Sequence, residues 1–514
     1  MVSGRWQDGR QGTGSGIALL TSPLVVAVVT FALTRPTLMP GVAFLDTGEF
    51  QTVGPLLGTA HSTGYPSYVI LGWIASVLLQ PFGEPAFRMN LLAALLAAVT
   101  AGLCAVLVEQ LTRRPLLAAA AGLIFGALPA AWQLATHADP HGLHVALVAL
   151  LFVLLVAWED RRGDRWLVAA TVVFGIAVGN HSLTFFLAPG IALFLLAVEP
   201  GILARRRFVV SCTLLLLVTA GAVYMELPLR AGPFRAPLVY GRPETLDGFL
   251  YVVFGVQFLG DVDWVGDLGA RLADLARFAG VQLGPLAILV PFGMLATAVR
   301  RPRYALLSFP PLVITCWFAA SYENAGIERY YLVPALIAVT WVAILIDELI
   351  GLVMSPRGRR GAPRTRKWAV APALEVGVAV LIILPTLGTL PARAAEVDRS
   401  DDRAAAEWLD LTFAQLEPNE VVVSWWDFST PLWYAQLCQG RRRDVWVVDD
   451  RTILDEGLGD VSHVIDANLG QRPVYLIRQP AEIATLATRY RLESLPAPSF
   501  QALDRVLGPI GDGS

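Results

Sequence analysis

The stretch FLDTGEFQTVGPLLGTAHSTGYP, residues 44–66, brings two acids and a histidine together in a chain that is otherwise largely apolar. Asp46 and Glu49 lie three positions apart, so in a helical turn they would share one face. Carboxylates held beside a bilayer are costly, which indicates that they serve a purpose. The stretch is therefore predicted to be a functional site, with a solvated loop or a helix cap as the alternative.

The composition is typical of a protein that crosses a membrane many times. Hydrophobic residues make up 55% of the 514 positions and charged residues only 16%, which excludes an ordinary soluble globule. The predicted fold is a polytopic α-helical membrane protein with about 11 transmembrane helices. The apolar stretches that would form them are 17–34, 89–109, 115–134, 141–157, 166–180, 183–198, 208–227, 279–299, 304–320, 332–350 and 368–390.

Clusters of basic residues between these stretches predict the topology. They lie at 113–114, 161–162, 205–207, 300–301 and 357–367. Since inner loops are enriched in Lys and Arg, all five are expected to face the cytoplasm, with a cytoplasmic N-terminus and an outer C-terminus. If Ser67 to Pro81 were also a span, the N-terminus and these five clusters could not all lie on the cytoplasmic side. This segment is therefore predicted to be an interfacial or re-entrant helix on the outer side.

The composition changes after Pro391, and the rest of the chain is water-soluble in character. Three short apolar runs there read as strands separated by helices: 420–426, 444–448 and 472–477. This alternation predicts a small α/β domain with a partly parallel sheet, and the lack of a glycine-rich phosphate loop argues against nucleotide binding. The predicted domains are a membrane domain, 1–391, and an extracytoplasmic α/β domain, 392–514.

With this topology, the unusual polar groups all fall on the outer face, which predicts an outer cavity. They come from distant segments, since the first loop is followed by HADPHGLH at 137–144 and by Asn180-His181. Pro140 and Gly142 are expected to interrupt regular helix in the second of these. The remaining outer blocks are LPLRAG at 227–232, YGRPETLDGFL at 240–250 and SYENAGIERYY at 321–331.

Four blocks together resemble one family of polytopic proteins: DTGEF with HSTGYP, GNHSL at 179–183, LPLRAG with GRPETLDGF, and the α/β tail. The animal member of that family is an O-mannosyltransferase acting on extracellular receptor domains, and the family is similar to the GT-C glycosyltransferases. The resemblance implies a GT-C-like fold, an acid in the first outer loop and a sugar donor carried on polyprenyl phosphate. HSTGYP and HADPHGLH depart from the family pattern. The resemblance therefore implies the class of reaction but does not identify the acceptor.

Transfer from a lipid phosphate needs a base for the acceptor hydroxyl and cations for the departing phosphate. Asp46 matches the family acid and is the predicted catalytic base, while Glu49 is expected to share a proton, orient the acceptor or ligate a metal. A guanidinium can pair bidentately with phosphate, so Arg230 is the first candidate cation and Arg329, beside Tyr330, the second. The alternative for each arginine is snorkelling or a loop ion pair.

The other predicted substrate contacts are histidines, tyrosines and one acid, each with a structural alternative such as packing or a hydrogen bond to the loop. The run around 137–144 contains residue types that bind metals, so a divalent cation is possible, although no metal site is assigned. Trp425, Trp426 and Asp427, at the end of the first tail strand, are further candidates for acceptor contact or for core packing. The predicted contacts are His61, Tyr65, His137, Asp139, His141, His181 and Tyr330.

These observations predict a membrane glycosyltransferase that moves a hexose, preferably mannose, from a polyprenyl-phosphate donor to a protein or glycan hydroxyl, with inversion. The expected partners are that donor, the acceptor and membrane lipid, with no nucleic acid. A transporter or translocase of lipid-linked sugars is the alternative; it would place ionisable residues near the bilayer midplane. A non-catalytic scaffold that binds through its tail is the third possibility.

Overall fold

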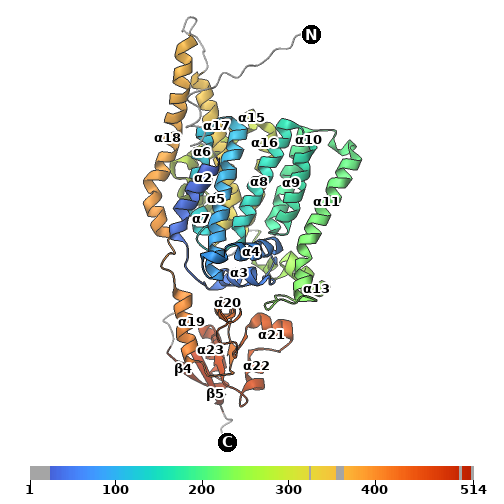
Figure 1. Cartoon of the computed structure of the whole chain (residues 1–514), viewed down its shortest axis with the longest axis vertical. Helices are drawn as coiled ribbons and strands as arrows, with labels where there is room; N and C mark the ends of the chain where they lie inside the picture. The colour runs from blue at the N-terminus through green and yellow to red at the C-terminus, as the bar shows by residue number, and fades with distance from the viewer. Residues whose placement is uncertain (1–22, 265, 323–325, 355–363, 497–500, 511–514) are drawn as a thin grey trace.

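The computed structural model describes residues 23–514 except 265, 323–325, 355–363, 497–500 and 511–514. It is an elongated molecule in which a bundle of long helices stands end to end with a smaller α/β tail (Figure 1). The chain leaves the bundle through α18 (Arg364–Val397), which continues past Pro391, and enters the tail at α19 (Ala404–Gln415). Independent folding of the two parts stays a prediction.

Seven helical segments are long and apolar enough to cross a membrane, counting only the described residues. Each coincides with one of the predicted spans. Four of the segments are single α-helices, and one is an α-helix preceded by a short 3-10 helix. The other two combine consecutive α-helices. They are α5 (Pro85–Thr112), α8 (Pro140–Arg161), α11 (Arg206–Tyr224) with α12 (Glu226–Ala231), α14 (Leu268–Leu283) to α15 (Val290–Arg300), α16 (Pro302–Ser321), η7 (Ile327–Tyr331) with α17 (Leu332–Met354), and residues 373–397 of α18.

The other four predicted spans coincide with shorter helices, so the count of 11 stays a prediction. These are α2 (Pro23–Thr34), α6 (Pro115–Gly126) with α7 (Pro129–Leu134), α9 (Asp164–Val178), and η3 (Ser182–Leu187) with α10 (Ala188–Val198). Short elements complete this part of the chain: η1 (Arg35–Thr37), η2 (Gln80–Phe82), η4 (Ile202–Ala204), α13 (Leu246–Phe254), η5 (Val256–Asp261) and η6 (Gly284–Leu289).

The first turn of α8 differs from expectation. Pro140 does not interrupt the helix but begins it, and the helix continues through Gly142. A proline is tolerated at the first helical position because its missing N–H would have no partner there. Asp139 is the N-cap, since its side chain accepts from the backbone N–H of His141. His141 and His144 therefore lie on one helical face.

Four of the five arginine clusters gather at one end of the bundle, away from the tail. Arg113 pairs with Asp160, and Arg300 lies 2.8 Å from Glu348, so the ends of α5, α8, α15 and α17 meet there. The fifth cluster, 357–367, lies outside the residues whose side chains are described. The one-sided distribution is confirmed for these four; which side faces the cytoplasm stays a prediction.

The stretch at 44–66 forms α3 (Leu45–Leu56) and the loop that leads into α4 (Pro66–Leu78). Both helices lie at the end of the bundle that faces the tail (Figure 1). Asp46 occupies the first turn of α3, where the positive end of the helix dipole favours a carboxylate. The segment 67–81 is thus a short helix at the bundle end, next to α3.

The tail contains one five-stranded sheet with strand order β2-β1-β3-β5-β4. Strand β1 pairs in parallel with β2 and β3, and β5 pairs antiparallel with β3 and β4. The predicted partly parallel α/β domain is therefore confirmed. The sequence did not reveal β4 and β5, whose residues are partly exposed and include charged side chains. The elements are β1 (Val421–Val423), α20 (Trp426–Leu437), β2 (Trp446–Val448), α21 (Asp450–Glu456), α22 (Val461–Asn468), β3 (Val474–Leu476), α23 (Pro480–Leu486), β4 (Tyr490–Leu495) and β5 (Leu503–Pro509).

The tail is docked firmly on the bundle. Val42 and Ala86 of the membrane part belong to the same buried apolar cluster as Trp408 and Phe428 of the tail. The hydroxyl of Tyr434 in α20 accepts a hydrogen bond of 3.0 Å from the backbone N–H of Ala86. The contacts that join the two parts are therefore both apolar and polar.

Gly48 permits the close approach of α3 to α20. A Cβ added there would lie 2.8 Å from the Thr430 hydroxyl oxygen and closer still to the Ala43 carbonyl oxygen. We expect Gly48→Ala to destabilise the fold by about 1–3 kcal/mol, because the two helices would have to separate. Thermal unfolding in detergent should show a lower midpoint. Gly221→Ala is the matched control, since nothing lies within 4 Å of its Cβ position.

Candidate active site

A cavity of about 730 Å³ lies where the bundle end meets the tail. Its lining comes from five separate parts of the chain: α3 and the following loop, η3, the region around α13 and η5, the end of α16 with η7, and the tail. Aromatic side chains form much of its wall, and Asp46, His61 and Arg329 supply acidic and basic groups. Such a combination of apolar wall and few convergent polar groups is typical of a ligand site.

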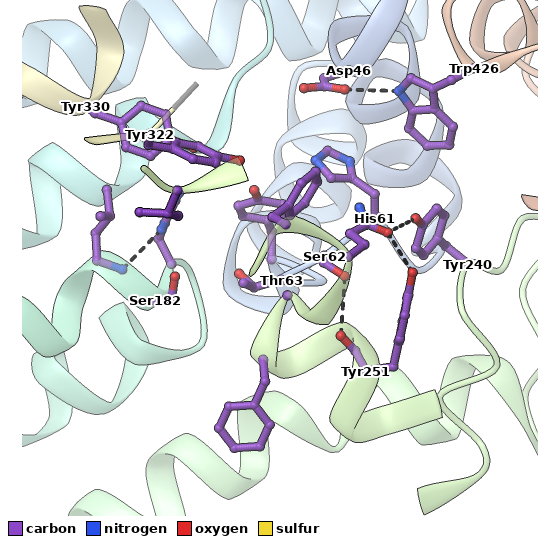
Figure 2. A pocket seen from close by; sticks show the side chains of 18 of the residues that line it. Asp46, His61, Ser62, Thr63, Ser182, Tyr240, Tyr251, Tyr322, Tyr330 and Trp426 are labelled. Carbon is purple, nitrogen blue, oxygen red and sulfur yellow. Dashed lines mark hydrogen bonds between the residues drawn. The ribbon is translucent and has the colours of Figure 1, made fainter. Parts of the chain in front are cut away.

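Asp46 is held between the tail and η7. Its Oδ1 accepts a 3.0 Å hydrogen bond from the indole Nε1 of Trp426, the first residue of α20. Its Oδ2 lies 3.8 Å from Nη2 of Arg329. The carboxylate is still 35% exposed toward the cavity. Figure 2 shows Asp46 and Trp426 facing one another, with His61 beside them.

Arg329 is fixed by a buried acid behind it. Nη1 donates to Oδ2 of Asp139 at 2.9 Å, while Oδ1 of Asp139 accepts from the backbone N–H and Nδ1 of His141 at 2.7 and 2.8 Å. Burial opposes ionisation of Asp139, but His141 and Arg329 outweigh it and hold its pKa well below the ordinary value. The guanidinium is thereby anchored at the cavity wall by a carboxylate that stays ionised.

His61 is paired with the other acid of α3. Glu49 is 1% exposed, and its Oε1 accepts from the backbone N–H of His61 at 2.7 Å while its Oε2 contacts Nδ1. Glu49 does not appear in the lining of the cavity among the described residues, whereas His61 does. Glu49 therefore reaches the cavity through the imidazole rather than directly.

Tyr65, His181 and Tyr330 form one wall of the cavity. The ring centroid of His181 lies 5.5 Å from that of Tyr65 and 6.0 Å from that of Tyr330. His141 packs behind at a tilted angle, with its ring centroid 4.6 Å from that of His181. His141 and Asp139 thus support the wall instead of lining it.

Besides Asp139 and His141, two further predicted contacts lie away from the cavity lining. Arg230 donates to the carbonyl oxygens of Leu57 and Leu56 at 2.7 and 3.3 Å, so it holds the last turn of α3. His137 contacts the hydroxyl of Thr136 at 3.0 Å. Across the described part of the chain, no three His, Cys, Asp or Glu side chains are arranged to hold a metal ion, so the divalent cation that the sequence left open has no such ligand set there.

The tail supplies cavity residues that the sequence analysis missed. Asp449, Asp450 and Arg451 follow β2, at the carboxyl end of the parallel strands where α/β sheets bind ligands. The guanidinium of Arg451 lies 4.8 Å from the ring centroid of Tyr240 and 4.9 Å from that of Tyr251. No local sequence pattern distinguishes Arg451 from other arginines. Its neighbour Tyr240 does begin the YGRPETLDGFL block, which the sequence analysis placed on the outer face.

Trp426 is expected to position the carboxylate of Asp46. We predict that Trp426→Phe lowers the rate of the reaction catalysed in this cavity about 10-fold, because a hydrogen bond to a charged group is lost. The thermal midpoint should change little, since the phenyl ring retains most of the packing. Trp446→Phe in β2, outside the cavity lining, is the control. If Trp426→Phe were as active as the control Trp446→Phe, Trp426 would not position Asp46.

The fold and the cavity define a polytopic membrane protein with a GT-C-like fold and a small C-terminal α/β domain. Two crystal structures of ArnT from Cupriavidus metallidurans are similar over 96% of this chain and 98% of their own. The structure bound to undecaprenyl phosphate has a TM-score of 0.62 at 14% identity, and the apo structure has 0.61 at 15%. At that identity the similarity shows the fold alone.

Comparison with known sequences shows that part of this chain is similar to one protein family. Residues 46–200 match the family model "Protein O-mannosyl-transferase TMEM260 N-terminal domain", so the chain is similar to that family over this region. Protein O-mannosyl-transferase TMEM260 of Mus musculus is 32% identical over 269 residues. That alignment covers 50% of this chain and 36% of the mouse protein. The region 46–200, which the family model matches, contains Asp46, Glu49, His61 and the HADPHGLH run.

Proposed function

We propose that this protein is a membrane glycosyltransferase that transfers a hexose, preferably mannose, from a polyprenyl-phosphate donor to a hydroxyl of a protein or glycan. The observation that carries the proposal is the pairing of Asp46 with Arg329, 3.8 Å apart at the edge of an aromatic cavity at the bundle end. The relationship to an O-mannosyltransferase and the fold of a protein crystallised with undecaprenyl phosphate support it.

The proposed roles follow from the geometry. Asp46 accepts the proton of the attacking hydroxyl as general base. Arg329 binds the phosphate and stabilises the charge that develops on it as the bond to the sugar breaks. Since the acceptor attacks the anomeric carbon directly, the configuration inverts. Tyr65, His181 and Tyr330 offer aromatic and imidazole surface for the sugar or the lipid phosphate.

The proposed orientation places the cavity and the α/β domain (392–514) outside the cytoplasm, with the N-terminus inside. Support comes from the four arginine clusters at the opposite end of the bundle, since such clusters favour the cytoplasmic side. The cavity also lies at the bundle end rather than within it. That position favours a transferase over a translocase, which would need ionisable groups at the membrane midplane.

The decisive experiment uses the purified full chain with synthetic polyprenyl-phosphate mannose and Ser- or Thr-containing peptides or short glycans. Release of polyprenyl phosphate is measured together with the covalent product by mass spectrometry, and the anomer is assigned by NMR. A covalent product is expected. Movement of the donor across proteoliposomes without any product would instead identify a translocase. Mass spectrometry of envelope proteins and glycans, with and without the protein, would then identify the natural acceptor.

A further inference from the structure

Glu49 is a buried acid whose two oxygens are both used by one neighbouring residue. Oε1 accepts the backbone N–H of His61 at 2.7 Å, and Oε2 contacts Nδ1 of the same residue. With 1% of its surface exposed, Glu49 is closed off from solvent. Burial raises the pKa of Glu49 above its ordinary value, and the pairing with His61 opposes that rise and so favours the charged form.

The same contacts fix the orientation of the imidazole. With Nδ1 bound to Glu49, Nε2 is the ring nitrogen that remains for a ligand in the cavity that His61 lines. Aromatic rings hold the imidazole on several sides, with centroids 5.5 Å away at Phe50, 5.4 Å at Tyr65 and 5.7 Å at Trp426. The surrounding rings therefore fix the orientation of the imidazole, as required of a group that must form a hydrogen bond with a substrate atom.

The charges around His61 favour its protonated form. Burial lowers the pKa of His61, but the carboxylates of Glu49 and Asp46 outweigh this effect and raise it to about 9. Arg329 opposes them only weakly. Glu49 also lines a second, small cavity of about 60 Å³, together with Thr59, Leu238 and Trp433. Among the described residues, the charged and titratable groups that face His61 or this small cavity are Glu49 and Asp46 of α3, Tyr65, Tyr240, Arg329 of η7, and Asp449, Arg451, Asp455 and Glu456 of the tail.

We propose that His61, kept as an imidazolium by Glu49, donates a hydrogen bond from Nε2 to the phosphate oxygen that leaves the sugar. The inference rests on the proposed function and adds a second cation to it. The acceptor oxygen forms the new bond to the anomeric carbon and gives its proton to Asp46. The bond between that carbon and the phosphate oxygen breaks, and its electron pair stays on the phosphate, which gains one negative charge. Arg329 and the imidazolium stabilise that charge together.

Glu49 is in this scheme a positioning residue, and Glu49→Gln tests it. The amide can still accept the backbone N–H of His61 and donate to a neutral Nδ1, so the geometry is kept while the charge is lost. Because burial lowers the pKa of His61 and the carboxylate of Glu49 no longer opposes it, that pKa should fall from about 9 to the ordinary 6.5 or below. At pH 8 donor cleavage should therefore fall at least about 30-fold, in proportion to the protonated fraction of His61.

The measurement is the pH profile of kcat for release of polyprenyl phosphate from synthetic polyprenyl-phosphate mannose. The alkaline limb should move from near pH 9 in the wild type to pH 6.5 or below in Glu49→Gln. Asp460→Asn is the matched control, because Asp460 pairs with His463 in the same way but both are exposed on the tail. The control should keep the wild-type profile.

His61→Gln supplies a second readout that does not depend on titration. Losing the cation beside the developing charge should lower kcat about 100-fold below pH 9 and remove the alkaline limb, because the amide is neutral at every pH. Circular dichroism and thermal unfolding identify variants that fail to fold. If the wild type and Glu49→Gln share one profile, the imidazolium role is wrong while the transferase proposal stands. If the wild type does not cleave the donor, the proposed function itself fails.

Discussion

Asp46→Asn should abolish sugar transfer while leaving the fold intact. The amide has the shape of the carboxylate and can still accept the indole hydrogen bond from Trp426, so the tail should stay docked. It cannot accept a proton, however, and a general base typically contributes about 10²- to 10⁴-fold. The expected result is a loss of at least about 10³-fold in kcat, with donor binding retained.

The measurement compares transfer from synthetic polyprenyl-phosphate mannose by the wild type and by Asp46→Asn at saturating donor. Asp410→Asn is the control, because Asp410 is an exposed tail carboxylate that pairs with Arg441 at 2.6 Å. Thermal midpoints of all three proteins should agree closely. Equal transfer by Asp46→Asn and the wild type would remove Asp46 from the mechanism.

Arg329→Met should cause the second large loss, in both stability and activity. Asp139 is almost fully buried and receives the 2.9 Å hydrogen bond of Arg329, so removing the cation leaves a buried carboxylate that is paired with His141 alone. Breaking a buried pair in this way costs about 3–5 kcal/mol. The rate should also fall about 10²- to 10³-fold, because one group that stabilises the phosphate charge is gone.

The double variant Arg329→Met with Asp139→Asn separates these two effects. It removes the buried charge together with its partner, so the thermal midpoint should recover most of the loss. Activity should not recover, since the cavity still lacks the guanidinium. Recovery of transfer along with stability would mean that Arg329 serves only the fold.

Much of the site could be predicted because topology constrains it. Asp46 and Arg329 are remote in sequence, but basic clusters and apolar spans placed both on one face, and the structure brings them within 3.8 Å. Arg230 was expected in the same cavity. Its position immediately beyond a span could not reveal that the carbonyl oxygens at the end of α3 would occupy its guanidinium.

Other features needed the tertiary structure. The hydrogen bond from Trp426 to Asp46 joins positions separated by 380 residues, and no local pattern connects them. The effect of Pro140 was misjudged because a proline that breaks a helix interior is well suited to its first position. The strands β4 and β5 were missed because their apolar residues are interrupted by charged ones.

The docking of α20 against α3 has a consequence for biosynthesis. Asp46 is synthesised 380 residues before Trp426, and the loop after β2 that completes the cavity is made later still. The cavity can therefore be assembled only after both the bundle and the tail as far as Arg451 have been synthesised. A chain that stops before the tail lacks part of the cavity wall, so under the proposed function it should not cleave the donor.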